Sequence, residues 1–357
     1  MVSSPITVFI VDSCAIARQR LLDSLSAASE IQVIGTASNG IEALEHIPQL
    51  QPDVVCTNLE MPKMDGCELI RRLLAVYPRP ILVVSPMVQT TEPETIAKVL
   101  KAGAVDVFPQ PITGRWSSGD QQALIAKIKV LSGVKVFTKP LHQSPTIPIL
   151  RSTIPAHRPS PKLSADAPQI LAIGASTGGP QAIHQILSLL PADFPLPILC
   201  TQHISAGFLP GLIGWQDTMC PLTVKVAEDG ECPLPGTVYF APDHYHLTLD
   251  VLGCCHYSAA PAVNRHCPSI TVMFQSLAQH YGAGVLGVLL TGMGQDGAAG
   301  LQAIAQSGGA TIAQDEATSV VFGMPKVAIE LGAAQTILPV EQIASFILQQ
   351  LSLPCPI

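Results

Sequence analysis

Seven prolines fall between residues 140 and 168, in a stretch without apolar periodicity, and this stretch limits how the 357-residue chain can fold. Proline has no backbone N–H group and cannot continue a helix or a central strand, so the segment is predicted to be an extended linker. A single hydrophobic core rarely grows beyond about 250–300 residues, which favours two domains. The predicted organisation is one domain over residues 1–132, a basic linker over residues 133–167 and a second domain over residues 168–357.

Short apolar runs alternate with helical patterns on both sides of this linker. Strands that alternate with helices build a parallel sheet covered by helices, so five such units in the first part predict a flavodoxin-like (βα)5 domain. After the linker the pattern restarts at residue 169 with a strand, a glycine-rich turn and a helix, which predicts a doubly wound, mostly parallel α/β domain. The strand-like runs of the first part are residues 6–11, 31–36, 53–57, 80–85 and 104–108.

The composition argues against membrane insertion and against nucleic-acid binding. The longest apolar runs, such as residues 284–290, are much shorter than the ~20 residues that a spanning helix needs. A net charge of -7 and the absence of a basic helix are unlike a surface that binds phosphates. The ten cysteines are scattered without a C-x-x-C pair, so reduced thiols are predicted. We expect a cytoplasmic protein that binds no nucleic acid and inserts into no membrane.

One local group of residues in the second part has side chains that can bind metals. An H-x-H pair on a strand points both imidazole rings to one face, a geometry that a metal ion can use. Strand histidines are more often hydrogen-bonded surface or cleft residues, so no metal site is predicted. The group consists of His244, His246, Cys254, Cys255 and His256.

A G-x-S-x-G motif, formed by Gly174, Ser176 and Gly178, follows the first apolar run of the second part. Such a turn presents a serine hydroxyl at the end of a strand, beside free amides at the start of a helix, and so suits a nucleophile. His203 and Asp296 also follow apolar runs. Because parallel strands end at one edge of their sheet, the three side chains can converge as a triad. Their order Ser, His, Asp disfavours a lipase-type fold, in which the order is Ser, Asp, His.

A second glycine motif supports an alternative, a dinucleotide-binding oxidoreductase. Gly292, Gly294 and Gly297 form a G-x-G-x-x-G motif after an apolar run, and Asp315 follows at about the spacing of a ribose-binding acid. Asp296 argues against this function, because its carboxylate lies in the loop that should receive a pyrophosphate.

Residues 168–352 carry six segments that, together and in this order, resemble the CheB-type chemotaxis methylesterase domain. By this resemblance Ser176 is the nucleophile, His203 the general base and Asp296 its orienter, with Thr177 and Met293 supporting the oxyanion. The resemblance implies no cofactor. The segments are IGASTGG, TQHISAGF, APDHYHL, NRHCPSITVMF, LTGMGQDGAAG and AQDEATSVVFGMPKVAIELGA.

The resemblance also implies a reaction and a partner. The expected reaction is hydrolysis of glutamyl γ-methyl esters on the cytoplasmic helices of a methylated chemoreceptor, with glutamine deamidation as a related activity. One departure from the family is Cys267, where arginine is more common in the H-R-P-S motif.

The first part resembles the response-regulator receiver family over residues 5–132, through NLEMPKMDG at 58–66 and VDSCAIARQRLL at 11–22. The resemblance implies a domain that contacts other chemotaxis signalling proteins. The pattern of strands and helices matches the family, but most of the residues that carry out phosphoryl transfer in the family are replaced.

The missing chemistry is visible at the positions that match the family's functional residues. Asn58 stands at the phosphoacceptor aspartate, Ser13 at one acidic magnesium ligand and Gln110 at the family lysine. Only Asp12 and the hydroxyl of Ser85 remain. An amide cannot accept a phosphoryl group as a carboxylate does, and one carboxylate makes a weak magnesium site. We therefore expect a degenerate receiver that does not become phosphorylated.

Overall fold

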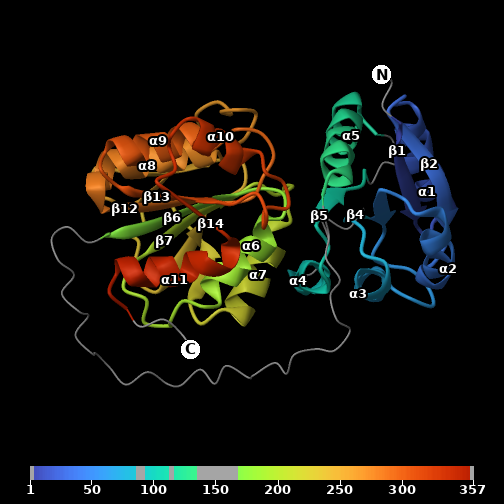
Figure 1. Ribbon diagram of the computed structural model, residues 1–357, viewed down its shortest axis with the longest axis horizontal. Helices are drawn as coiled ribbons and strands as arrows, with labels where there is room; N and C mark the ends of the chain where they lie inside the picture. The colour runs from blue at the N-terminus through green and yellow to red at the C-terminus, as the bar shows by residue number, and fades with distance from the viewer. Residues whose placement is uncertain (1–3, 86–92, 112–115, 135–167, 354–357) are drawn as a thin grey trace. The chain divides into compact units, whose positions relative to one another are not determined.

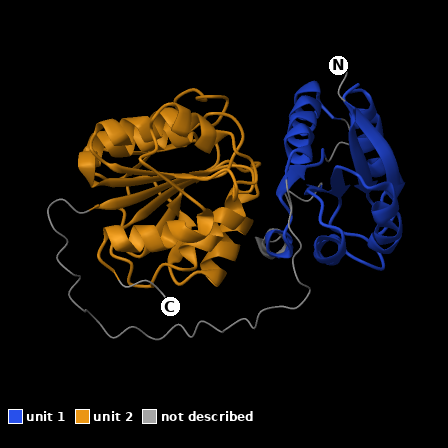
Figure 2. Cartoon of the chain, in the orientation of Figure 1, with its two compact units in different colours: residues 1–146 blue, residues 147–357 orange. Residues whose placement is uncertain are grey.

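A computed structural model of the chain describes residues 4–85, 93–111, 116–134 and 168–353. The predicted linker over residues 133–167 lies, from residue 135 onward, outside the described residues. The chain divides into two compact units, residues 1–146 and residues 147–357 (Figure 2). No helix of the described ranges is long and apolar enough to cross a bilayer.

The first unit is built on a five-stranded sheet in the order β2-β1-β3-β4-β5, in which every neighbouring pair is parallel. This is the flavodoxin-like topology predicted from the sequence. Helix α1 packs against α5, whereas α3 packs against α2 and α4, so the two groups cover opposite faces of the sheet, as right-handed crossovers require. The elements are β1 Ile6–Val11, α1 Ala15–Ser26, β2 Ile31–Ala37, α2 Gly40–Leu50, β3 Val54–Thr57, α3 Gly66–Val76, β4 Ile81–Ser85, α4 Pro93–Ala102, β5 Asp106–Pro109 and α5 Ser118–Ser132.

The second unit is built on a seven-stranded parallel sheet in the order β14-β13-β12-β6-β7-β9-β8. Helices α8, α9 and α10 cover one face, and α6, α7 and α11 cover the other (Figure 1). The elements are β6 Ile170–Ala175, α6 Gly179–Leu187, β7 Ile198–Gln202, α7 Leu209–Met219, β8 Thr223–Val226, β9 Thr237–Phe240, β10 His246–Leu249, β11 Cys255–Ser258, α8 Ile270–Tyr281, a short 3₁₀ helix Gly282–Gly284, β12 Val285–Leu289, α9 Ala298–Gln306, β13 Ala310–Gln314, α10 Met324–Glu330, β14 Thr336–Leu338 and α11 Val340–Gln350.

The chain leaves β6 toward β7 on one side and returns to β12 on the other side, so the strand order reverses between β6 and β12. Such a reversal opens a crevice at the carboxyl ends of the strands, where open α/β sheets bind their ligands. All residues of β6, β7 and β12 are buried, because helices cover both faces of the sheet. The doubly wound fold predicted for this part is confirmed, and a separate antiparallel hairpin of β10 and β11 is added to it.

The prediction of reduced thiols holds for seven described cysteines but is wrong for two, and the assumed H-x-H geometry is also wrong. Cys232 and Cys254 form a disulfide, because the loop before β9 lies along the start of β11: Cys255 donates its N–H to the Glu231 carbonyl at 2.7 Å. His244 is not on a strand; it lies before β10 with a φ of 69°, so the H-x-H geometry assumed from the sequence does not exist. Within the described residues, no three side chains are grouped as a metal site.

Candidate functional site

Three loops meet at the carboxyl ends of β6, β7 and β12. Ser176 directly follows β6 and His203 directly follows β7, while Asp296 lies in the loop between β12 and α9. Ala175 is paired with Gln202 across the two strands, and the His203 amide donates to the Ala175 carbonyl at 2.9 Å. Since neighbouring strands are about 4.8 Å apart, the backbones of Ser176 and His203 are next to each other. The three loops therefore meet at this edge of the sheet, and the backbones of Ser176 and His203 lie side by side there.

The turn that carries Ser176 requires glycine. Gly178 has a φ of 79°, a conformation that side chains with a Cβ rarely adopt, and an added Cβ there would lie 2.5 Å from Val320. A Cβ on Gly179 would lie 2.1 Å from the side chain of Gln202. The Ser176 amide donates to the Thr291 carbonyl at 3.0 Å, which ties the turn to the end of β12.

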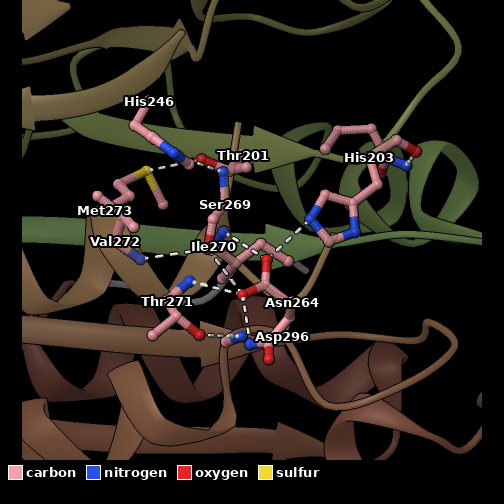
Figure 3. Close-up of polar contacts among 12 residues, drawn as sticks. Thr201, His203, His246, Asn264, Ser269, Ile270, Thr271, Val272, Met273 and Asp296 are labelled. Atoms are coloured by element: carbon pink, nitrogen blue, oxygen red, sulfur yellow. Dashed lines mark hydrogen bonds and ion pairs between the residues drawn. The ribbon is translucent and has the colours of Figure 1, made fainter. Parts of the chain in front are cut away.

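His203 and Asp296 form a buried pair. The Nε2 atom of His203 lies 2.9 Å from Oδ2 of Asp296, and the two side chains are 8% and 0% exposed (Figure 3). A carboxylate only accepts hydrogen bonds, so Nε2 carries the proton and Nδ1 is unprotonated in the neutral ring. Nδ1 is buried and has no hydrogen-bond partner among the described residues. The ring therefore keeps a basic nitrogen available, although no hydrogen bond joins it to Ser176 in the described part of the chain.

The start of α8 holds Asp296 in place. Ser269, the N-cap of α8, donates its hydroxyl to Oδ1 at 2.8 Å, and the Ile270 amide donates to Oδ2 at 2.8 Å (Figure 3). The Thr271 amide at 3.3 Å and the Asn264 side chain at 3.4 Å complete the set. Unpaired amides at a helix N-terminus favour negative charge, so this position suits an ionised carboxylate.

The pKa of Asp296 reflects opposing effects. Burial acts to raise the pKa of this carboxyl. The hydrogen bond and charge interaction with His203, together with the hydrogen bonds from Ser269 and Thr271, lower the pKa by more than burial raises it. The net pKa lies below the ordinary value for aspartate. Asp296 is therefore ionised near neutral pH and stabilises a positive charge on His203.

A second histidine stacks on His203. The ring of His266 lies 3.7 Å from that of His203, centroid to centroid, at an interplanar angle of 5°. Burial lowers the pKa of His266 to about 4, the charge of His203 acts in the same direction, and Asp296 opposes both. His266 is therefore neutral near pH 7. A pocket of about 140 Å³ opens beside the two rings, and Arg265 and Cys267 contribute to its lining.

The two residues predicted to support an oxyanion flank Ser176. Thr177 follows it in the turn, and the Thr177 carbonyl accepts from the hydroxyl of Thr291 at 3.0 Å. Met293 follows Gly292, whose missing Cβ would lie 2.6 Å from the Cβ of Ser176, so this loop passes directly against the serine. Among the described residues, no hydrogen bond occupies the amide of Met293.

The two carboxylates that bear on a dinucleotide site, those of Asp296 and Asp315, form hydrogen bonds within the protein. Asp296 fills the glycine loop with a buried carboxylate bound to His203 and α8. The Asp315 carboxylate, predicted as a ribose ligand, accepts from the hydroxyl and the amide of Thr318 at 2.6 and 3.0 Å. The structure therefore gives the oxidoreductase alternative no support.

Sequence reasoning missed Asn264 and Ser269, and it considered His246 only as a possible metal ligand. Ser269 could have been found, since a serine directly before the apolar run ITVMF is a typical helix N-cap. The contacts of the other two depend on loops that meet only in the fold.

The receiver positions also lie together, at the carboxyl edge of the first sheet. The Asn58 amide donates to Oδ1 of Asp12 at 3.3 Å, and the Asp12 carboxylate also accepts from the Cys14 amide at 2.9 Å. Burial raises the pKa of Asp12, against these two hydrogen bonds. Ser85 and Gln110 are buried at the ends of β4 and β5. The edge thus holds the Asp12 carboxylate, the Ser85 hydroxyl and two amide side chains, those of Asn58 and Gln110.

The Ser13 hydroxyl, at the position of the second acidic ligand, donates to the Glu60 carbonyl at 3.1 Å. An O–H group used in this way adds no negative charge to the edge. The receiver site therefore has less charge than a hard dication needs.

Comparison with known proteins gives one consistent result. The family described as CheB methylesterase matches residues 171–347, and the family described as response regulator receiver domain matches residues 8–115. A protein-glutamate methylesterase/protein-glutamine glutaminase of Myxococcus xanthus is 39% identical over 351 residues, covering 97% of both chains. One from Syntrophus aciditrophicus is 38% identical over 348 residues, covering 95% of this chain and 96% of its own.

A solved structure agrees with these relatives. The crystal structure of the Thermotoga maritima CheB methylesterase catalytic domain is 39% identical, with a TM-score of 0.50, and covers 51% of this chain and 98% of its own.

Proposed function

The chain belongs to the family of CheB-type protein-glutamate methylesterases, hydrolases that act in chemotaxis, and we propose that Ser176, His203 and Asp296 form its catalytic triad. The proposed substrate is the γ-methyl ester of a glutamate residue on the cytoplasmic helices of a chemoreceptor, and the product alcohol is methanol. Deamidation of glutamine is a second proposed reaction, because the relatives are named for both activities. The proposed location is the cytoplasm, where these helices lie.

The hydrogen bond of 2.9 Å between His203 and Asp296 carries this proposal, because it leaves the other ring nitrogen unprotonated. His203 follows β7, which is paired with β6, the strand that Ser176 follows. Nδ1 of His203 takes the hydroxyl proton as Oγ of Ser176 attacks the ester carbonyl carbon. The carboxylate of Asp296 stabilises the imidazolium that forms. No cofactor is needed for these steps.

Two backbone segments support the negative charge of the tetrahedral intermediate. Amides near Thr177 and Met293 donate to the oxyanion as the carbonyl double bond opens. The imidazolium of His203 then gives its proton to the departing methoxide, which leaves as methanol, or to the amine that leaves as ammonia. Water, deprotonated by the same ring, attacks the acyl-enzyme and restores Ser176 and a free carboxylate.

Mass spectrometry of a receptor fragment tests the proposed reaction. The full chain, incubated with a methyl-esterified fragment of a chemoreceptor, should remove the methyl group from esterified glutamates and convert glutamine to glutamate. Persistence of the esters would contradict the proposal. Tight binding of a nicotinamide dinucleotide by the purified chain would instead support the oxidoreductase alternative.

The stacked His266 predicts acid sensitivity. The unfolded chain takes up a proton on this ring below about pH 6.5, whereas the folded protein does so only near pH 4, so the free energy of unfolding falls as the pH drops between these values. By pH 5 the loss from this residue should reach about 2 kcal/mol. His266→Phe keeps a stacked ring but cannot titrate. Urea unfolding at pH 7 and pH 5 should show a smaller pH dependence in the variant; equal dependence would contradict this prediction.

The altered receiver predicts that small phosphodonors do not control this enzyme. Acetyl phosphate with Mg²⁺ should neither label the protein nor raise its rate of ester hydrolysis, because Asn58 is no phosphoryl acceptor. Asn58→Asp restores a carboxylate at the same position and is the matched variant. A stoichiometric, acid-stable and base-labile label on the unmodified chain would contradict the prediction.

Without phosphorylation, we propose that the first unit binds other chemotaxis signalling proteins. Any control of the esterase would then come from a partner that favours one conformation of the chain. A chain that starts near Asp166 distinguishes two cases. A marked gain in activity means that the first unit restrains the esterase, and no gain means that it serves only for docking.

A further inference from the structure

His246, singled out in the sequence as a possible metal ligand, uses both of its ring nitrogens inside the protein. Its side chain is fully buried at the first position of β10. Nδ1 accepts from the Ser269 amide at 3.0 Å, and Nε2 lies 3.2 Å from the carbonyl oxygen of Pro261. An amide only donates and a carbonyl only accepts, so the ring is neutral with its proton on Nε2. No nitrogen remains for a metal.

These contacts connect His246 to the active site through one residue. Ser269 donates its amide N–H to His246 and its hydroxyl to Asp296 at 2.8 Å, and Ser269 is itself fully buried (Figure 3). The next amide, of Ile270, donates to the other carboxylate oxygen of Asp296. A continuous series of hydrogen bonds thus runs from β10 through the start of α8 to the catalytic pair.

The hairpin is also attached to α8 further along. The Leu249 amide, at the end of β10, donates to the Ser276 hydroxyl at 2.8 Å. Strand β10 therefore holds α8 at its first turn, through Ser269, and near its middle. A loss of the contact at Ser269 would free the first turn while the rest of the helix stays in place.

We propose that His246 is a positioning residue, which fixes the N-terminus of α8 so that Ser269 and Ile270 hold Asp296 against His203. This proposal rests on the proposed triad. Removal of the Nδ1 acceptor leaves the buried Ser269 amide unpaired, and the N-cap shifts to reduce that cost. Small displacements of catalytic groups lower the rate of the chemical step more than they lower the binding of substrate.

Two substitutions of His246 test the proposal. His246→Leu keeps an apolar volume but has no acceptor, and it should lower kcat for ester hydrolysis by about 10- to 100-fold with little change in KM. His246→Asn offers a carbonyl oxygen close to the position of Nδ1 and should restore kcat to within a few-fold of the unmodified enzyme. Leu247→Val, at an equally buried neighbour in β10, is the control and should leave kcat unchanged.

A spectroscopic measurement separates this role from the proposed function. The Nε2 proton of His203, bonded to a carboxylate, gives a far-downfield proton resonance whose position reports the geometry of the pair. This resonance should move or broaden in His246→Leu and stay in place in His246→Asn and Leu247→Val. Unchanged kcat and resonance in His246→Leu, or equal damage in His246→Asn, would overturn the proposal. Full activity of Ser176→Ala would contradict the proposed triad. The resonance would still test whether His246 positions the pair of His203 and Asp296.

Discussion

Replacement of Ser176 by alanine is expected to lower kcat for ester hydrolysis by a factor of about 10⁴ to 10⁶. The variant loses only the hydroxyl proposed to form the acyl-enzyme, while residue 176 keeps its backbone hydrogen bonds to Thr291 and Gly179. The measurement is the rate of methanol release, alongside thermal unfolding to verify that the fold is intact. Ser188→Ala, at the other end of α6, is the matched control and should keep full activity.

A double variant makes this first prediction sharper. In the proposed triad the serine and the histidine act as one unit, so Ser176→Ala combined with His203→Ala should be scarcely slower than either single variant. Additive losses would mean that the two residues act in separate steps, and near-normal turnover in Ser176→Ala would exclude it as the nucleophile.

The second large effect is expected from Asp296→Asn, which should lower kcat by about 10⁴. An amide nitrogen placed toward Nε2 of His203 would donate a proton there, so the ring would carry its own proton on Nδ1, the nitrogen that must accept from the serine. The new side chain also provides only one acceptor oxygen to Ser269 and Ile270, and an unsatisfied buried donor costs about 1–3 kcal/mol of stability.

Steady-state kinetics and urea unfolding together test this variant. Asp315→Asn is the control, because that carboxylate caps the turn at Thr318 and takes no part in the triad. Equal losses of activity in both variants would mean that the effect of Asp296→Asn is structural rather than electrostatic.

Much of the fold and the approach of Ser176 to His203 could be predicted from the sequence, for a physical reason. Alternating strands and helices allow few arrangements other than a parallel sheet, and residues that directly follow neighbouring parallel strands must meet at one edge. The pairing of Ala175 with Gln202 then fixes how closely they approach. The lack of a phosphoacceptor carboxylate at position 58 could also be predicted, because the sequence itself shows asparagine there.

The support of Asp296 could not be predicted in the same way. It comes from the first turn of α8, which is itself held by His246 on a hairpin that follows no strand-helix alternation. The disulfide of Cys232 with Cys254 depends on the same hairpin and on a loop folded beside it. The spacing of apolar residues along a segment predicts whether it forms a helix or a strand. It does not predict which loops meet in three dimensions, and these contacts depend on that.

Methanol release from a methyl-esterified chemoreceptor fragment, measured with the full chain and no phosphodonor, tests the central claim most directly. We predict steady release by the unmodified protein and a loss of at least about 10⁴-fold in Ser176→Ala at equal concentration. Release that persists in Ser176→Ala, or its absence in both proteins, would contradict a Ser176–His203–Asp296 methylesterase.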